Sequence, residues 1–186
     1  RHIDPNAPVE LYTLANPLMI VCFQLLITKL VKKWTPVKSI LLGVGVTTAG
    51  MLLNIIPVLL YSDLSHRVSL AGLVIPIAGI FLLISIASMA AGEMMASPRI
   101  FEYIGSIAPK GEEGLYLGYA NLPVALGSIV GGPVGGALYQ KYIASPLQAG
   151  ASPNYLIIWV IIAFLGVCSM AGLAVYDRWV IKAKKS

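Results

Sequence analysis

The chain has 186 residues, of which 58% are hydrophobic and only 11% are charged, and its mean hydropathy is +0.83. This balance excludes an ordinary soluble globular domain and indicates a membrane protein. The formal net charge is +5. Because the basic residues gather beside apolar segments, we interpret this charge as a sign of membrane topology and exclude a nucleic-acid interface.

Five apolar segments are each long enough to cross a bilayer as a helix, which takes about 20 residues. They cover residues 11–31, 38–61, 73–107, 115–142 and 155–180. A barrel is disfavoured, since its strands would have about 10 residues with alternating apolar and polar positions. The sequence therefore predicts an all-α membrane protein. Residues 1–10 form an outer segment, residues 11–181 a transmembrane bundle and residues 182–186 a tail.

Lysines and arginines in short loops mark the cytoplasmic side of a membrane protein. One side of the predicted topology holds Lys29, Lys32, Lys33, Lys38, Arg99, Lys110, Arg178, Lys182, Lys184 and Lys185, and the other holds Arg1, Arg67 and Lys141. We therefore expect an extracytoplasmic amino end and a cytoplasmic carboxyl end, in a plasma membrane or a bacterial inner membrane.

The third segment contains a carboxylate, Glu93, within "SMAAGEMMASPRIFEYIG". A charge inside a bilayer costs between about 2.5 and more than 10 kcal/mol, so a retained carboxylate normally faces a water-filled cavity or a partner. Residues 73–92 alone could cross, which would leave Glu93 at the interface. The apolar pattern continues to Pro109, however, and this favours a cavity-facing, substrate-binding Glu93.

The residues that follow Glu93 predict a bend and an ion pair. Pro98 removes a backbone hydrogen bond and should bend the helix, which makes it a candidate hinge. Arg99 and Glu102 are three residues apart, so they can pair on one helix face. We expect a solvated or gate-closing pair at the cytoplasmic end.

Polar residues in two other segments are candidates for the same site. Asn16 precedes Pro17 in the first segment, where it either caps a helix turn or faces a ligand. Tyr119 and Asn121 are polar members of the fourth segment and candidate substrate-binding residues, and Pro123 is a second candidate hinge. Asn54 in the second segment predicts a local kink.

The fourth segment is rich in glycine. Steps of four residues place small side chains on one helix face, which typically packs closely against another helix. The glycines concerned are Gly127, Gly131, Gly132, Gly135 and Gly136. We expect these to serve helix packing.

An enzyme is disfavoured, because the sequence shows no nucleophile with a matched base, no metal-ligand cluster and no phosphate-binding loop. Cys22 and Cys168 lie in predicted spans and act most simply as small apolar residues. We therefore expect no cofactor and no metal.

Five stretches together resemble the carboxyl-terminal half of the proton-coupled oligopeptide transporters, a branch of the major facilitator superfamily. In order, they are "VELYTLANPLMI", "TPVKSILLGVG", "GEMMASP", "IAPKG" and "GLYLGYANLPVALGS". The resemblance covers about residues 9–140. It implies that the five spans form most of a six-helix bundle, whose partner is the missing amino-terminal half of the transporter.

The resemblance also implies roles for particular residues. Glu93 matches a glutamate that meets the amino terminus of a peptide or pairs with a lysine of the other half, and Asn16 matches an asparagine that contacts bound peptide. The chain differs from the family at Arg99 and Glu102, where small or apolar residues are usual. It also has Ala120 and Asn121 in place of an aromatic pair.

Three hypotheses on function follow. The first is proton-coupled uptake of small peptides or another amine-bearing solute by alternating access. The second keeps the transporter fold with a non-peptide solute, which the altered aromatic pair favours. The third is a membrane subunit that binds partners and transports nothing, because five spans do not supply the two halves that alternating access needs.

Overall fold

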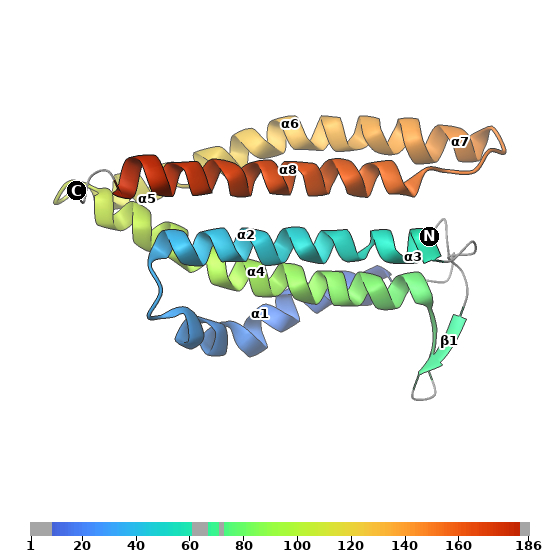
Figure 1. Ribbon diagram of the computed structural model, residues 1–186, viewed down its shortest axis with the longest axis horizontal. Helices are drawn as coiled ribbons and strands as arrows, with labels where there is room; N and C mark the ends of the chain where they lie inside the picture. The colour runs from blue at the N-terminus through green and yellow to red at the C-terminus, as the bar shows by residue number, and fades with distance from the viewer. Residues whose placement is uncertain (1–8, 61–66, 71–72, 183–186) are drawn as a thin grey trace.

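The structure is a computed structural model and describes residues 9–60, 67–70 and 73–182 (Figure 1). Its α-helices are α1 (Val9–Val31), α2 (Pro36–Leu53), α3 (Ile55–Leu60), α4 (Ile77–Ile107), α5 (Glu113–Tyr119), α6 (Leu122–Tyr139), α7 (Ser145–Gln148) and α8 (Tyr155–Tyr176). Two short strands, β1 (Arg67–Leu70) and β2 (Leu73–Pro76), and two π-helical turns, η1 (Gln140–Ala144) and η2 (Asp177–Lys182), complete the described elements.

Five helical stretches of the described residues are long and apolar enough to cross a membrane. They are Tyr12–Val31, Pro36–Leu60, Ile77–Ile107, Glu113–Gln148 and Tyr155–Trp179. The predicted number and order of the spans are thus confirmed, and the protein is embedded in a membrane. The predicted outer segment and tail fall mostly outside the described residues.

The third span begins later than the sequence predicts. Residues 73–76 form strand β2, which pairs antiparallel with β1, and helix α4 begins only at Ile77. Val74 and Ile75 are β-branched, and Ile75 also precedes Pro76, which disfavours the α conformation at that residue. The local sequence therefore stops the helix from extending back to Leu73.

Two spans are interrupted. The second breaks at Asn54, between α2 and α3, as the predicted kink requires. The fourth breaks at Ala120 and Asn121, between α5 and α6, with Pro123 in the first turn of α6. Pro98, by contrast, lies inside α4, which continues through it.

Helices α2 and α4 form the closest pair in the bundle, and they run antiparallel. A Cβ added to Gly43 would lie 2.6 Å from the carbonyl oxygen of Gly92, and one added to Gly50 would lie 2.7 Å from Cβ of Ser88. Only glycine allows the two backbones to approach this closely, as is typical of helix packing in membranes.

Buried hydroxyl and amide groups connect the same two helices. The Asn54 side-chain amide donates a 2.7 Å hydrogen bond to the Ser85 hydroxyl, and both residues are buried. The Ser88 hydroxyl donates to the carbonyl oxygen of Val46 at 3.0 Å. Such bonds stabilise helix association where no water competes.

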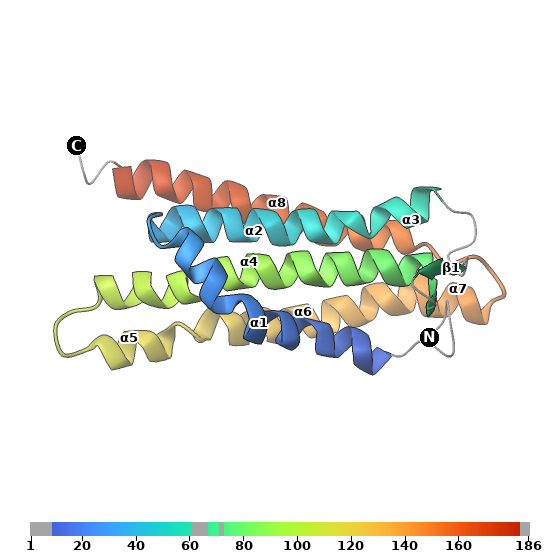
Figure 2. The same cartoon turned by 90° about the horizontal axis from the view of Figure 1, so that it is seen from below.

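The remaining spans differ in how much they pack. Helix α1 lies along α4, and α8 lies along α2 with Gly166 against Thr48 (Figures 1 and 2). Helix α6 is exposed along its length, with only Leu138 partly covered. No atom lies within 4 Å of a Cβ built on any of its five glycines, apart from the glycine's chain neighbours and its own helix backbone. Their predicted close packing is therefore not made within the part of the chain that the structure describes.

One end of the bundle collects the basic residues. We call it the basic end; it contains the α1–α2 connection, the α4–α5 connection and the carboxyl end of α8, all at the left of Figure 2. The exposed cations there include Lys29, Lys32, Lys33, Lys38, Lys110 and Arg178. The predicted grouping of charge is thus present in three dimensions.

Candidate functional site

Glu93 lies within the apolar span formed by α4, and its side chain is exposed on the surface of the bundle. Its neighbours Gly92 and Met94 are buried, because they turn towards α2 and α1. Among the described residues, none forms a hydrogen bond or ion pair with the Glu93 carboxylate. The carboxylate is therefore available to water, to a solute or to another polypeptide.

Asn16 lies well inside α1, which begins at Val9. Its side-chain oxygen, which would have to accept a backbone hydrogen bond to cap a helix turn, makes no such bond among the described residues. Its amide oxygen is buried and has no hydrogen-bond partner within the described ranges. A buried acceptor without a partner costs about 1–3 kcal/mol, so this oxygen is suited to accept a hydrogen bond from a ligand or from water.

Tyr119 and Asn121 flank the break between α5 and α6, and both side chains are exposed. The Tyr119 ring stands edge-on to Tyr116, with centroids 6.4 Å apart. The backbone N–H of Asn121 donates to Gly118 at 3.3 Å. No hydrogen bond between described residues joins Glu93, Asn16, Tyr119 and Asn121, so the structure does not bring these four candidates together by direct bonds.

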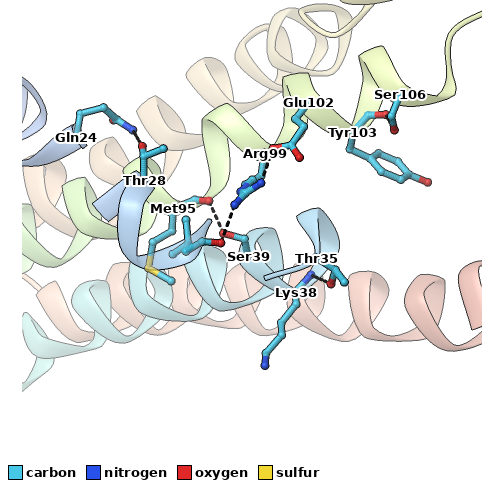
Figure 3. A network of polar contacts seen from close by, with 11 residues as sticks. Gln24, Thr28, Thr35, Lys38, Ser39, Met95, Arg99, Glu102, Tyr103 and Ser106 are labelled. Atoms are coloured by element: carbon cyan, nitrogen blue, oxygen red, sulfur yellow. Dashed lines mark hydrogen bonds and ion pairs between the residues drawn. The ribbon is translucent and has the colours of Figure 1, made fainter. Parts of the chain in front are cut away.

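The region around Pro98 is held by two neighbouring helices (Figure 3). Because proline has no N–H, the carbonyl of Met94 lacks its usual helical donor. The Gln24 side-chain amide of α1 donates to that carbonyl at 3.4 Å. In the same turn, the Ser39 hydroxyl of α2 donates to the carbonyl of Met95 at 2.8 Å. Helices α1 and α2 therefore fix α4 at its proline.

Arg99 forms the predicted pair with Glu102, at 2.5 Å between Nη1 and Oε2. The pair is only partly solvated, because Arg99 is buried while Glu102 is largely exposed. The second guanidinium nitrogen donates to the carbonyl oxygen of Val31 at 2.6 Å. Val31 is the last residue of α1, so Arg99 joins the basic ends of α1 and α4.

A second contact near the basic end joins α4 and α8. The hydroxyl groups of Tyr103 and Tyr176 are hydrogen-bonded at 2.7 Å. Sequence reasoning missed this contact, and it also missed Gln24 and Ser39. A polar side chain in an apolar span is a usable signal for Gln24, whereas nothing in the sequence pairs the two tyrosines.

The described residues contain no group of three or more His, Cys, Asp and Glu side chains that could hold a metal ion. Cys22 and Cys168 are free thiols on the bundle surface. Comparison with known proteins found no matching family, no matching curated protein and no matching solved structure. Glu93 and Asn16, two polar groups in the spans without a partner among the described residues, are the functional candidates that the geometry favours.

Proposed function

We propose that this chain is part of a secondary active transporter of the major facilitator type, coupled to protons, which moves small peptides or another amine-bearing solute by alternating access. The observation that carries the proposal is the exposed carboxylate of Glu93, which lies within a membrane span and has no partner among the described residues. Such a group is costly against lipid, so it favours a water-filled path or a partner beside α4.

The chemistry of two groups supports this substrate class. A carboxylate can hold a proton or pair with an ammonium group, and such charge-assisted bonds are the stronger ones. An amide oxygen can accept a hydrogen bond from a peptide N–H. Glu93 supplies the first group and the buried Asn16 oxygen supplies the second.

The proposed movement uses two of the spans that contain proline. Pro98 lies in α4 and Pro123 opens α6, and the Arg99–Glu102 pair lies beside the first of these prolines. We propose that these helices form a gate that rocks against another half around a site near the bilayer midplane. The basic end then faces the cytoplasm, as the positive-inside rule expects.

The test is substrate uptake by cells expressing the full-length protein with Glu93→Gln. The substitution should abolish the dependence of uptake on the proton gradient or weaken the apparent affinity for an amine-bearing substrate. Glu112→Gln is the matched control, since Glu112 is exposed in the α4–α5 connection. If Glu93→Gln changes neither property, the assignment is wrong.

A competition panel separates peptide from non-peptide substrates. Di- and tripeptides should compete with the transported solute if the site binds a peptide. If only non-peptide amines or neutral solutes compete, the transporter has a non-peptide substrate. The presence of Ala120 and Asn121 where the resembled family has an aromatic pair favours this outcome.

A second candidate is a membrane subunit that binds partners and transports nothing. The observation that favours it is α6, whose small-residue face contacts no other helix of the described chain. This alternative is supported if the purified protein contains no second half of about six or seven spans and shows no solute uptake under a proton gradient after reconstitution. Uptake that requires Glu93 would exclude it.

A further inference from the structure

Four lysines gather where α1 turns into α2. Lys29 lies in the last turn of α1, Lys32 and Lys33 lie in the connection, and Lys38 lies in the first turns of α2. All four side chains are exposed. We call this group the lysine corner.

Few acidic side chains of this protein are placed to neutralise the lysine corner. Residues 11–62 contain no Asp or Glu at all. Within the described ranges, no carboxylate forms an ion pair with Lys29, Lys32 or Lys33. Glu102 is bonded to Arg99, which in turn bonds the carbonyl oxygen of Val31 at the end of α1. Figure 3 shows the Lys38 amine pointing away from that pair.

The corner lies at the depth of lipid headgroups. Helix α1, which leads into it, has an exposed apolar face, on which Val21 is 81% and Leu25 is 85% exposed. Such an apolar surface within a span faces lipid acyl chains. Trp34 follows in the connection, with the Lys38 amine 5.5 Å from the centre of its ring. Tryptophan is enriched at the membrane–water interface, so the amines are placed beside the lipid phosphates.

We propose that the lysine corner binds anionic lipids through the phosphates of their headgroups. Juxtamembrane lysines are attracted to anionic leaflets, with about a fivefold gain in affinity for each charge. Arg99 also stabilises this connection. Its guanidinium bonds the carbonyl oxygen of Val31, which lies between Lys29 and Lys32 in the sequence. This property is independent of the transport proposal, since it concerns the lipid-facing side of α1.

Trp34 provides a local reporter of the bound lipid. This sequence has two other tryptophans, Trp159 and Trp179. Replacing these two, and any tryptophan outside this sequence, with phenylalanine leaves Trp34 as the single tryptophan. The full-length protein is reconstituted in phosphatidylcholine bilayers that contain brominated phosphatidylglycerol or, at the same mole fraction, brominated phosphatidylcholine. The brominated anionic lipid should quench Trp34 more strongly.

Variants show whether the lysine corner causes the stronger quenching of Trp34 by the anionic lipid. Changing Lys29, Lys32, Lys33 and Lys38 to Gln should reduce the apparent affinity for phosphatidylglycerol at least about fivefold. Changing the same four residues to Arg keeps the charge and should keep the affinity for phosphatidylglycerol. This variant shows that a loss of affinity in the Gln variant does not come from misfolding. Lys110→Gln with Arg178→Gln, at the same end, should also keep the affinity.

Three results would overturn the proposal. The first is equal quenching by the two brominated lipids. The second is stronger quenching by brominated phosphatidylglycerol that persists after the four Gln substitutions, in a protein whose helical circular dichroism is unchanged. The third is displacement of the effect by soluble inorganic phosphate at unchanged ionic strength, because the site would then recognise a free anion and not a lipid.

Discussion

The guanidinium of Arg99 donates a 2.6 Å hydrogen bond to the carbonyl oxygen of Val31, so a buried side chain of α4 holds the last residue of α1. The final carbonyls of a helix have no internal donor and carry the negative end of its dipole. A guanidinium donates a hydrogen bond to such a carbonyl, and its positive charge offsets the negative end of the dipole. Any movement of α4 beyond Pro98 is therefore transmitted to the α1–α2 connection.

Arg99→Leu should destabilise the bundle more than Glu102→Gln. The first substitution removes the charged donor from the buried carbonyl of Val31, which then keeps only the backbone N–H of Trp34 at 2.9 Å. A hydrogen bond to a charged group contributes about 1.5–3 kcal/mol. The second removes a partner that is 53% exposed, so solvent screening limits the loss to less than about 1 kcal/mol. Thermal unfolding in detergent measures the difference. Equal shifts in Tm for the two variants would contradict the role of Val31.

The sequence was sufficient to predict the five spans because length and hydropathy alone determine which segments can cross a bilayer. It also located the break at Asn54. The predicted start of the third span was wrong. Residues 73–76 are apolar enough for a span, but the β-branched Val74 and Ile75 and the following Pro76 favour a strand. Hydropathy does not distinguish these two conformations.

The candidate site was predicted less completely. The spacing of Arg99 and Glu102 was enough to predict their pair, since both lie on one helix. The bond from Arg99 to Val31 joins residues 68 positions apart, and its acceptor is a backbone carbonyl that every residue carries. No residue type marks such a partner. The packing of the α6 glycines likewise depends on which helix lies beside them.

Gly43→Ala and Gly131→Ala should have opposite effects on stability. The added methyl group at position 43 would lie 2.6 Å from the Gly92 carbonyl oxygen and force α2 and α4 apart, which costs about 1–3 kcal/mol. At position 131 nothing outside the helix lies within 4 Å. Alanine there gains helix propensity of up to about 1 kcal/mol.

The two glycine variants are compared by Tm in the same detergent. A stable Gly43→Ala protein would contradict the close α2–α4 packing. A strongly destabilised Gly131→Ala protein would show that a helix packs on the α6 glycine face in the assembled protein, as the predicted close packing of these glycines requires.

Gln24 and Pro98 should be energetically coupled. In the native protein Gln24 donates to the Met94 carbonyl that Pro98 leaves without a helical donor. Gln24→Leu should therefore destabilise the protein by about 1 kcal/mol. In a Pro98→Ala background, the new backbone N–H serves Met94, and the same change should cost less.

A double-mutant cycle on unfolding free energies measures this coupling, which should be about 0.5–1 kcal/mol. Gln24→Met retains the approximate size of the side chain but removes the donor, so it should behave like Gln24→Leu. Additive effects in the cycle would contradict the assignment of Gln24 to the carbonyl of Met94.

Glu93→Gln should leave the stability of the fold nearly unchanged, because no described residue bonds this carboxylate. Asn54→Leu is the contrasting variant. It removes a buried 2.7 Å bond to Ser85 and leaves the buried Ser85 hydroxyl with only a weak 4.0 Å contact to the Met89 sulfur, which costs about 1–3 kcal/mol. Tm values measured in detergent and in lipid nanodiscs should therefore fall for Asn54→Leu only. A large loss of Tm for Glu93→Gln would assign this carboxylate a structural role, and any effect of the substitution on uptake would then follow from unfolding.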